Sequence, residues 1–327
     1  MDKLIGVYAV KHKDPTIRAA SRSGGIFTAI SDKILSDGGA VFGCILSDDF
    51  LAYHVKATTK EQRDKMRGSK YIQSNMGDVF RDVKVELDSG RLVLFTGTSC
   101  QVDGLKSFLG KDYDNLLCID IVCHGVPSPK VWLDYLKWQE QKNNKRVVSV
   151  DFRNKTDFGW SAHIETLYTK DGSSISSEVF KELFYGHNIL RPSCYECHYK
   201  SIHHPSDITI ADYWGIDKAA PGFNDNKGVS LVLINTDKGK QYFDLVSACL
   251  ESVPTDINKS LQPPLQRSFP CPASREQFWK DLDTHNFYYI AKKYGGLLSP
   301  LQKSILKCKV LVKRILNPLL RREKNNG

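Results

Sequence analysis

The sequence predicts an α/β fold: a central mixed, partly parallel sheet with flanking helices. Two short apolar runs, residues 91–97 and 115–123, have the composition of buried strands. The segment 101–110 between them has helical spacing and ends in a glycine. A strand–helix–strand order of this kind is typical of a parallel βαβ unit.

Strands and helices also alternate in the rest of the first half of the chain. The elements before the βαβ unit are expected at residues 4–10 (strand), 23–37 (helix), 40–46 and 52–58 (a strand pair), and 59–66 and 75–87 (polar helices). After the unit, residues 128–141 predict an amphipathic helix, with Ser128 as the N-cap and Pro129 at the first helical position.

The second half changes character. Alternating segments predict exposed antiparallel strands at 147–153 and 161–169, and the cysteine-rich insertion 191–215 shows little periodicity. Further elements are expected at 230–236 (buried strand), 238–250 (helix) and 274–293 (helical). We expect three parts: an α/β domain over 1–250, a proline-punctuated connector and helix over 251–296, and a basic amphipathic helix over 297–327.

The composition is that of a soluble globular enzyme, with 41% hydrophobic and 25% charged residues. No apolar run approaches the roughly 18 residues that a membrane span needs. The N-terminal residues resemble a first strand more than a signal peptide. Nine cysteines, an odd number without an export signal, indicate a reducing cytoplasm in which cysteines bind metal or do redox work.

The net charge of +9 is concentrated at the C-terminus. From Lys292 onward the chain has ten basic residues and one acidic residue, so the body is balanced and nucleic acid is not an expected partner. An apolar stripe at helical spacing runs along this segment through Leu298, Leu301, Ile305, Cys308, Val312, Ile315 and Leu319. Such a helix can lie on an anionic membrane at the inner face, dock on its own domain, or pair with a partner chain.

Four cysteines are candidate metal ligands. Cys194 and Cys197 form a CxxC, whose spacing lets two thiolates reach one metal centre from a tight turn. Cys100 and Cys123 each follow a strand of the βαβ unit, so both are expected at the carboxyl edge of the sheet, where α/β proteins place ligand sites. Four thiolates suit zinc or an iron–sulfur cluster.

Other assignments of these residues stay open. The CxxC with two of the histidines His198, His203 and His204 would make a structural zinc knuckle. The remaining cysteines in apolar runs are expected to be structural: Cys44, Cys118, Cys249 and Cys308.

Three polar, glycine-bearing turns adjoin expected helices or strand ends. Residues 21–25 open a helix, where backbone N–H groups favour a phosphate and glycines allow close approach. Residues 67–71 add two cations, a hydroxyl and an aromatic ring, and residues 96–101 form a third turn. Each turn alone is typical of ordinary loops, and neither GxGxxG nor GxxxxGK[ST] occurs.

Six ordered motifs together carry a family resemblance: RSGGIFTAI, RGSKYIQS, LFTGTSCQVDGLKSFL, DIVCHGVPSPKVW, SCYEC and SDITIADYWG. Over roughly residues 3–240 the chain resembles the coenzyme F420 hydrogenase/dehydrogenase beta-subunit family. Proteins of this family typically bind FAD and a [4Fe–4S] cluster, and pass electrons between a two-electron donor, such as the deazaflavin F420, and one-electron acceptors.

The resemblance implies site residues by position. The cluster cysteines of the family correspond here to Cys100, Cys123, Cys194 and Cys197. The flavin-contacting segments correspond to Arg22, Ser23, Gly24 and Gly25, to Gly68, Ser69, Lys70 and Tyr71, and to Thr96, Gly97 and Thr98. Ser99 stands where the usual motif has proline. Stand-alone chains of this kind resemble bacterial relatives linked to surface-polysaccharide loci.

These observations favour an iron–sulfur flavoprotein oxidoreductase whose partner is a redox protein or a small-molecule donor. The alternatives are a zinc-stabilised scaffold or accessory protein of glycan-assembly enzymes, and a transferase helper with decayed flavin loops. Asp212, His124 and Lys70 are the polar residues expected near the flavin, whereas Tyr213 and Trp214 are more typical of core.

Overall fold

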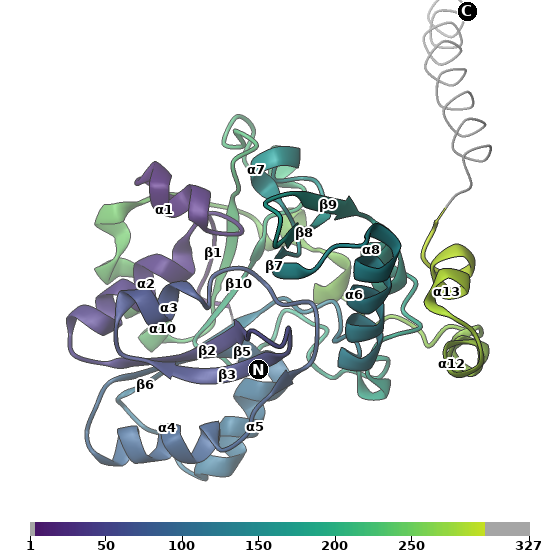
Figure 1. The fold of residues 1–327 in the computed structure, drawn as a ribbon. Helices are drawn as coiled ribbons and strands as arrows, with labels where there is room; N and C mark the ends of the chain where they lie inside the picture. The colour runs from purple at the N-terminus through teal and green to yellow at the C-terminus, as the bar shows by residue number, and fades with distance from the viewer. Residues whose placement is uncertain (1–3, 298–327) are drawn as a thin grey trace, which may run out of the picture.

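The computed structural model describes residues 4–297, which contain a large sheet of nine strands (Figure 1). In spatial order its strands are β12 (Leu250–Pro254), β1 (Gly6–His12), β11 (Ser230–Ile234), β10 (Ile208–Asp212), β6 (Leu116–Ile121), β5 (Val93–Thr98), β2 (Ala40–Leu46), β3 (Ala52–Ala57) and β4 (Ser74–Asn75). The βαβ unit of β5, α5 (Ser99–Leu109) and β6 therefore lies near the middle of this sheet, where helices cover both faces.

The middle of the large sheet is parallel and its flanks are partly antiparallel. β2, β5, β6 and β10 run parallel, whereas β11, β1 and β12 pair antiparallel on one side and β3 pairs antiparallel with β2 on the other. α5 connects β5 to β6, and the two strands end in register at Thr98 and Ile121. This mixed sheet with flanking helices confirms the predicted fold class.

Alternate strand residues face two helical layers. On one face, Val41 and Leu94 pack with Ile30 of α2 (Ile26–Ser36) and with α10 (Asp237–Leu245). On the other face, Phe42 and Phe95 pack with α4 (Val79–Asp88) and α5. Shorter helices lie around this framework: α1 (Pro15–Ala20), α3 (Lys60–Asp64), α9 (Ile216–Ala219) and α11 (Ile257–Ser260), with 3₁₀ turns at Ser247–Cys249 and Pro263–Leu265.

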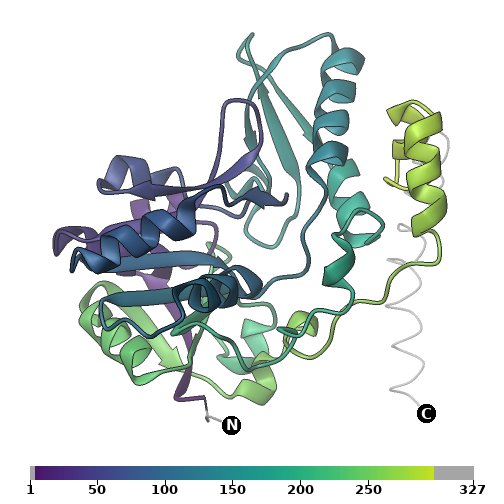
Figure 2. The same ribbon diagram turned by 90° about the horizontal axis from the view of Figure 1, so that it is seen from below.

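A second, three-stranded sheet stands beside the large one, together with α6 (Pro129–Asn143) and α8 (Val179–Tyr185) (Figures 1 and 2). Its antiparallel strands are β7 (Val147–Asp151), β8 (Glu165–Thr169) and β9 (Ser174–Ser177), with α7 (Lys155–Phe158) between the first two. Trp132 of α6 and Phe180 of α8 are buried in its core, which also holds Phe278 of α12 (Arg275–Thr284) and Ile290 of α13 (Phe287–Lys293).

Several predicted boundaries were wrong. The helix predicted over 238–250 ends at Leu245, and Leu250–Pro254 is instead the edge strand β12, which pairs with β1 beyond the expected domain end at residue 250. The insertion 191–215 contains β10, and the helix expected from residue 75 begins at Val79, because Ser74 and Asn75 pair with β3. Ser128 does precede α6, but its side chain makes no capping hydrogen bond.

The apolar stripe predicted from Leu298 to Leu319, and with it the basic C-terminal helix, lies outside the described residues. Within residues 4–297, no helix combines the length and the apolar character that crossing a membrane requires.

Candidate cofactor-binding site

A cavity of about 610 Å³ runs along the carboxyl edge of the large sheet. It reaches from Asp212 of β10 and Ser230 of β11, past β6 and β5, to Cys44 of β2 and His54 of β3. Five strand spacings of about 4.8 Å give this row of strands a width of roughly 24 Å. The cavity is therefore long enough for an extended ligand, at the edge where α/β proteins bind ligands.

The residues assigned to a flavin by resemblance are brought together here. All of them except Gly24 line the cavity: Arg22, Ser23, Gly25, Gly68, Ser69, Lys70, Tyr71, Thr96, Gly97 and Thr98. The three polar residues expected nearby, Asp212, His124 and Lys70, line it as well. Tyr213 is fully buried, as expected of a core residue, but Trp214 is 38% exposed and borders the cavity.

Gly24 holds the first loop against the sheet. Its carbonyl oxygen accepts from His12 N at 2.7 Å, and its N–H donates to the Ser230 hydroxyl at 2.9 Å. A Cβ at this position would lie 2.0 Å from the carbonyl oxygen of Val10, so no larger residue fits. Gly25 then caps α2 in the left-handed conformation, with φ of 96°. The glycine pair thus sets the start of α2 at the cavity wall.

Cys44, His54 and Lys70 come together in another part of the cavity. Cys44 and His54 are cross-strand partners of β2 and β3, so they project from the same face of the sheet. The Lys70 ammonium donates to the carbonyl oxygens of Lys65 and Arg67 at 2.9 and 3.0 Å. Burial lowers the pKa of Lys70 to about 8, and the nearby Cys44 thiol opposes this shift. Cys44, expected to be structural, therefore also borders the cavity.

His54 is held as a neutral imidazole in one tautomer. Its Nε2–H donates to the carbonyl oxygen of Thr96 at 3.1 Å, since a carbonyl oxygen can only accept. Burial lowers the pKa of His54 to about 4. Its Nδ1 is buried without a hydrogen-bond partner among residues 4–297. A ligand N–H group in the cavity could donate the missing hydrogen bond to this nitrogen.

Two of the four candidate cluster cysteines, Cys100 and Cys123, lie at the same cavity. Cys100 lies in the first turn of α5, which the Gln101 side chain caps by accepting from Thr98 N at 2.9 Å, and Cys123 lies two residues past β6. Both line the cavity, whereas Cys194, which ends a 3₁₀ turn (Pro192–Cys194), and Cys197 do not.

Charge interactions connect these thiols. Burial raises the pKa of Cys123 to about 12, Lys200 opposes this, and the Cys194 and Cys100 thiolates push it further up. Burial also raises the pKa of Cys194, with contributions from Cys197 and Cys100. The charge interactions therefore link Cys123 with Cys194 and Cys100, and Cys194 with Cys197 and Cys100. None of the eight cysteines in the described part of the chain is in a disulfide.

The surroundings of the four thiols fit a group with negative charge. The buried ammonium of Lys200 donates to the carbonyl oxygen of Cys123 and lies 5.4 Å from the Phe269 ring centroid. Nowhere in residues 4–297 do three His, Cys, Asp or Glu side chains meet as they would around one metal ion. In an iron–sulfur cluster each thiolate binds a different iron atom, so the sulfurs stand farther apart than around one ion. Thiolates are the ligands that iron–sulfur clusters prefer, so the chemistry of the donors fits such a group.

The histidines of the alternative zinc knuckle are either hydrogen-bonded to other side chains or exposed. His204 Nδ1 lies 2.8 Å from Asp120 Oδ2 and 3.1 Å from the Ser99 hydroxyl, so this side chain ties the insertion to the start of α5. Ser99 is the first residue of α5, a position that also suits proline. His198 and His203 are exposed.

Sequence reasoning missed the part of the cavity wall that the small sheet and α8 contribute. Arg153 follows β7, and Phe184 and Tyr185 end α8, yet all three line the cavity with residues of the large sheet. Their roles depend on contacts between segments that are distant in the sequence, such as that of Arg153 with Asp212, 59 residues away. No local motif marks them, so only a spatial signal would have found them.

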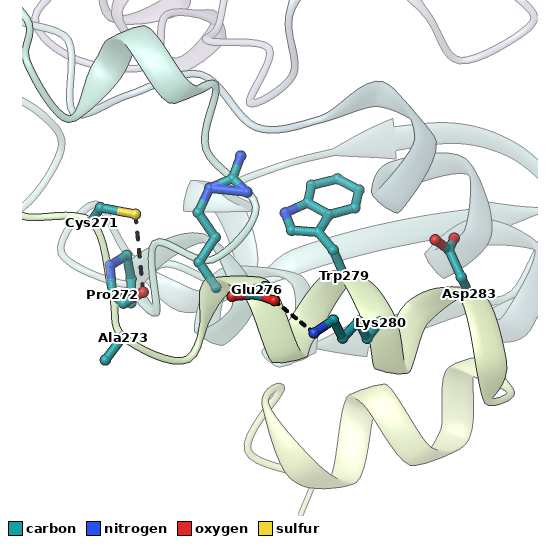
Figure 3. A pocket seen from close by; sticks show the side chains of 8 residues that line it. Cys271, Pro272, Ala273, Glu276, Trp279, Lys280 and Asp283 are labelled. Carbon is teal, nitrogen blue, oxygen red and sulfur yellow. Dashed lines mark hydrogen bonds and ion pairs between the residues drawn. The ribbon is translucent and has the colours of Figure 1, made fainter.

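A second hollow, of about 560 Å³, lies on α12 and the segment before it (Figure 3). It is lined by Cys271, Pro272, Ala273, Arg275, Glu276, Trp279, Lys280 and Asp283. Arg275 stacks on both Trp279 and Tyr195, at 5.4 and 5.5 Å from their ring centroids. Because Tyr195 lies between the two cysteines of the CxxC, the contact of Arg275 with its ring joins this hollow to the cysteine knuckle. None of the predicted cofactor residues lines it, so we place the functional site in the larger cavity.

An α/β sheet with glycine-bearing loops, cations and thiols around a cavity at its carboxyl edge defines a cofactor-binding protein. The chain belongs to the coenzyme F420 hydrogenase/dehydrogenase beta-subunit family: the family's N-terminal part matches residues 7–81 and its C-terminal part residues 90–256. This confirms the resemblance carried by the six motifs. Membership supports an oxidoreductase role in electron transfer and an iron–sulfur cofactor in general.

Two known proteins are similar to this chain. The chloroplastic 7-hydroxymethyl chlorophyll a reductase of Oryza sativa subsp. japonica is 26% identical over 186 residues, which are 55% of this chain and 36% of the reductase. This chain thus spans about a third of the reductase's length. A chain of the F420-reducing [NiFe] hydrogenase complex from Methanosarcina barkeri has the same fold, with a TM-score of 0.54 and 19% identity over 78% of this chain and 83% of that one.

Proposed function

We propose that this protein is an iron–sulfur flavoprotein oxidoreductase that passes electrons from a two-electron donor to one-electron acceptors. In this proposal FAD occupies the large cavity, and a [4Fe–4S] cluster is ligated by Cys100, Cys123, Cys194 and Cys197. The donor is a reduced deazaflavin of the F420 type or another two-electron carrier. The acceptor is a redox protein or a small molecule.

One observation carries the proposal: the cavity is lined both by the predicted flavin segments and by two of the predicted cluster cysteines. Thr98 and Cys100 are two residues apart, and the Thr98 hydroxyl lies 3.1 Å from the Cys100 sulfur. A flavin held by the Thr96–Thr98 loop would therefore lie directly beside the cluster. Short separation is what electron transfer between two cofactors requires of the protein.

When bound, FAD takes up two electrons together and the cluster carries them one at a time. The protein's residues position both groups and set the charge around them. Lys70 supplies a cation in the cavity, and His54 presents an acceptor nitrogen in a fixed tautomer. Lys200 offsets the negative charge of four thiolates. The aromatic side chains of Tyr71 and Phe184, with ring centroids 5.4 Å apart, limit the access of water.

The cellular setting belongs to the same proposal. We place the protein in the cytoplasm, in surface-polysaccharide biosynthesis, with a redox partner protein. The similar hydrogenase chain is part of a complex, which favours such a partner. Contact of the C-terminal segment with the inner face of the membrane stays a prediction.

The proposal is tested by mixing FAD- and cluster-loaded protein anaerobically with reduced F420, NADH or NADPH, and following the cluster by electron paramagnetic resonance. We expect at least one donor to reduce the cluster, and only when FAD is present. Dithionite should reduce the cluster with or without FAD. A cluster that dithionite reduces but none of the donors does, or one reduced equally fast without FAD, would contradict the proposed function.

A further inference from the structure

Two arginines share one carboxylate where the small sheet meets the cavity. Arg153 Nη1 donates to Asp212 Oδ2 at 2.7 Å, and Arg22 Nε lies 3.6 Å from the same oxygen. The other oxygen of Asp212 accepts from Trp160 Nε1 at 3.0 Å. Both oxygens of Asp212 are therefore engaged, and all three charged side chains are nearly buried, with 5 to 11% of their surface exposed.

The charges in this region do not balance. Besides Arg22 and Arg153, the Lys155 ammonium donates to three backbone carbonyl oxygens and to no carboxylate. The carboxylates close to these cations are Asp212 and Asp151. Arg18 is a further cation close to Lys155 and is paired with Asp225, so four cations in this region face three carboxylates. A buried charge without a counter-charge is unfavourable, so a bound anion would complete the region.

The two guanidinium groups also have unused donors. Nε of Arg153 is buried and has no hydrogen-bond partner within the described part of the chain, and Nε of Arg22, also buried, has only the 3.6 Å ion pair with Asp212, which is too long for a hydrogen bond. Buried N–H groups are nearly always paired in folded proteins, so a bound group is the natural partner. Both arginines line the cavity.

Stacking fixes the plane of one of these groups. The Arg153 guanidinium lies over the Trp214 ring, 5.0 Å from its centroid, and Trp214 stacks on Trp160 at 5.0 Å. A planar guanidinium held in this way matches the two oxygens of a phosphate or a carboxylate. A lysine at this position would carry the charge without that geometry.

We propose that Arg22 and Arg153 form an oxyanion-binding site at this end of the cavity, which takes a phosphate or carboxylate group of the bound ligand. The inference rests on the proposed function, because it assigns the oxyanion to a ligand of that function. The oxyanion is either the pyrophosphate of FAD or part of an anionic substrate. The shared chemistry is a two-oxygen anion received by two guanidinium groups.

The test compares the affinities of FAD, FMN and riboflavin for full-length protein by flavin fluorescence. The variants are Arg153→Gln, Arg153→Lys and, as a matched control, Arg146→Gln, because Arg146 is exposed and lies just before β7. If the FAD pyrophosphate fills the site, Arg153→Gln weakens FAD at least about tenfold and leaves riboflavin unchanged, with Arg153→Lys in between. Arg146→Gln should bind all three flavins as the wild type does.

If a substrate anion fills the site, Arg153→Gln leaves all three flavin affinities unchanged. Inorganic phosphate, titrated calorimetrically into FAD-loaded protein, then binds the wild type and loses affinity at least about tenfold in Arg153→Gln. A folded Arg153→Gln variant with unchanged FAD and phosphate affinities would overturn the inference. Failure of the wild type to bind any flavin would instead count against the proposed function, while phosphate binding to the flavin-free protein would still decide the inference.

Discussion

Thr98 of β5 and Ile121 of β6 are register partners at the ends of two parallel strands, and this pairing places two cysteines at the same edge of the sheet. Cys100 and Cys123 each follow their partner by two residues. A strand-register relationship, rather than proximity in sequence, therefore brings half of the proposed cluster ligands to one edge. The CxxC reaches the same edge from the insertion.

Replacing Cys123 with serine should remove the cluster. Iron and sulfide contents are expected to fall to background, and the visible absorbance of the cluster should disappear, because its site needs all four thiolates. Cys249→Ser is the matched control, since the Cys249 sulfur contacts the carbonyl oxygen of Val246 at 3.0 Å and Cys249 does not line the cavity. Full iron and sulfide in Cys123→Ser would show that the ligand assignment is wrong.

Lys70→Met should lower the reduction potential of the bound flavin by about 30 mV or more, equivalent to about tenfold for a two-electron couple. The variant lacks a cation near the flavin, and this cation would stabilise the negative charge that develops on the flavin when it is reduced. Because burial lowers the pKa of Lys70 to about 8, its ammonium is charged below pH 8 and loses its proton as the pH rises through that value.

The difference between wild type and Lys70→Met should accordingly be largest near pH 6.5 and shrink by pH 9.5. Potentiometric titration at both pH values measures it. Lys65→Met is the control, because the Lys65 side chain is exposed and only its backbone carbonyl oxygen accepts a hydrogen bond from Lys70. An equal difference at both pH values would rule out this role of the Lys70 charge.

Ionisation of the Glu165 carboxyl group should lower the free energy of unfolding of the wild type as the pH rises from 4.5 to 7. Its carboxyl group is 1% exposed and accepts from the Tyr135 hydroxyl and from Phe180 N, both at 3.0 Å. Burial raises its pKa from 4.5 to about 7, so in this window the folded state binds more protons than the unfolded state. The stability it contributes is present below pH 4.5 and is lost as the pH passes 7.

Glu165→Gln lacks this titration. The free energy of unfolding of Glu165→Gln, minus that of the wild type, should therefore increase by about 3 kcal/mol between pH 4.5 and pH 8. Urea unfolding at several pH values gives the difference, and exposed Glu178→Gln should show no such trend. A pH-independent difference for Glu165→Gln would refute the prediction.

Gly24→Ala should destabilise the protein by about 2 kcal/mol or more, because the added methyl group would collide with the Val10 carbonyl oxygen and displace the first loop. Flavin affinity should fall with it. Gly104→Ala in α5 is the opposite case: its methyl group would lie 3.6 Å from the Phe80 ring of α4, and alanine favours a helix by about 0.5–1 kcal/mol. Thermal unfolding of both variants checks the pair, and equal melting temperatures would contradict the clash.

The elements with strong local patterns could be predicted from the sequence. Residues 40–46 are β2 as expected, and the apolar runs around α5 gave the parallel unit on which the site is built. The edge strand β12 was missed because LESVP mixes charge, apolar residues and proline, and only its pairing with β1 makes it a strand.

The cavity was predictable only in part. Its loops on the large sheet contain glycines but look like ordinary turns one by one, and the family resemblance of the ordered motifs is what assigned residues 22–25, 68–71 and 96–98 to a flavin. Arg153, Phe184 and Tyr185 reach it from the small sheet and α8, and nothing near them in sequence indicates a site. Cys44 was assigned to the core because it lies in an apolar run, yet its cross-strand partner His54 places it at the cavity.

The cofactor content of full-length protein purified anaerobically tests the central claim most directly. Iron, sulfide and zinc are measured per chain, together with the flavin released by heat. We predict FAD in about equal amount to the chain, and about four iron and four sulfide per chain, the composition of the proposed cluster. A colourless protein with zinc, no flavin and no sulfide would contradict it and favour the zinc-stabilised scaffold.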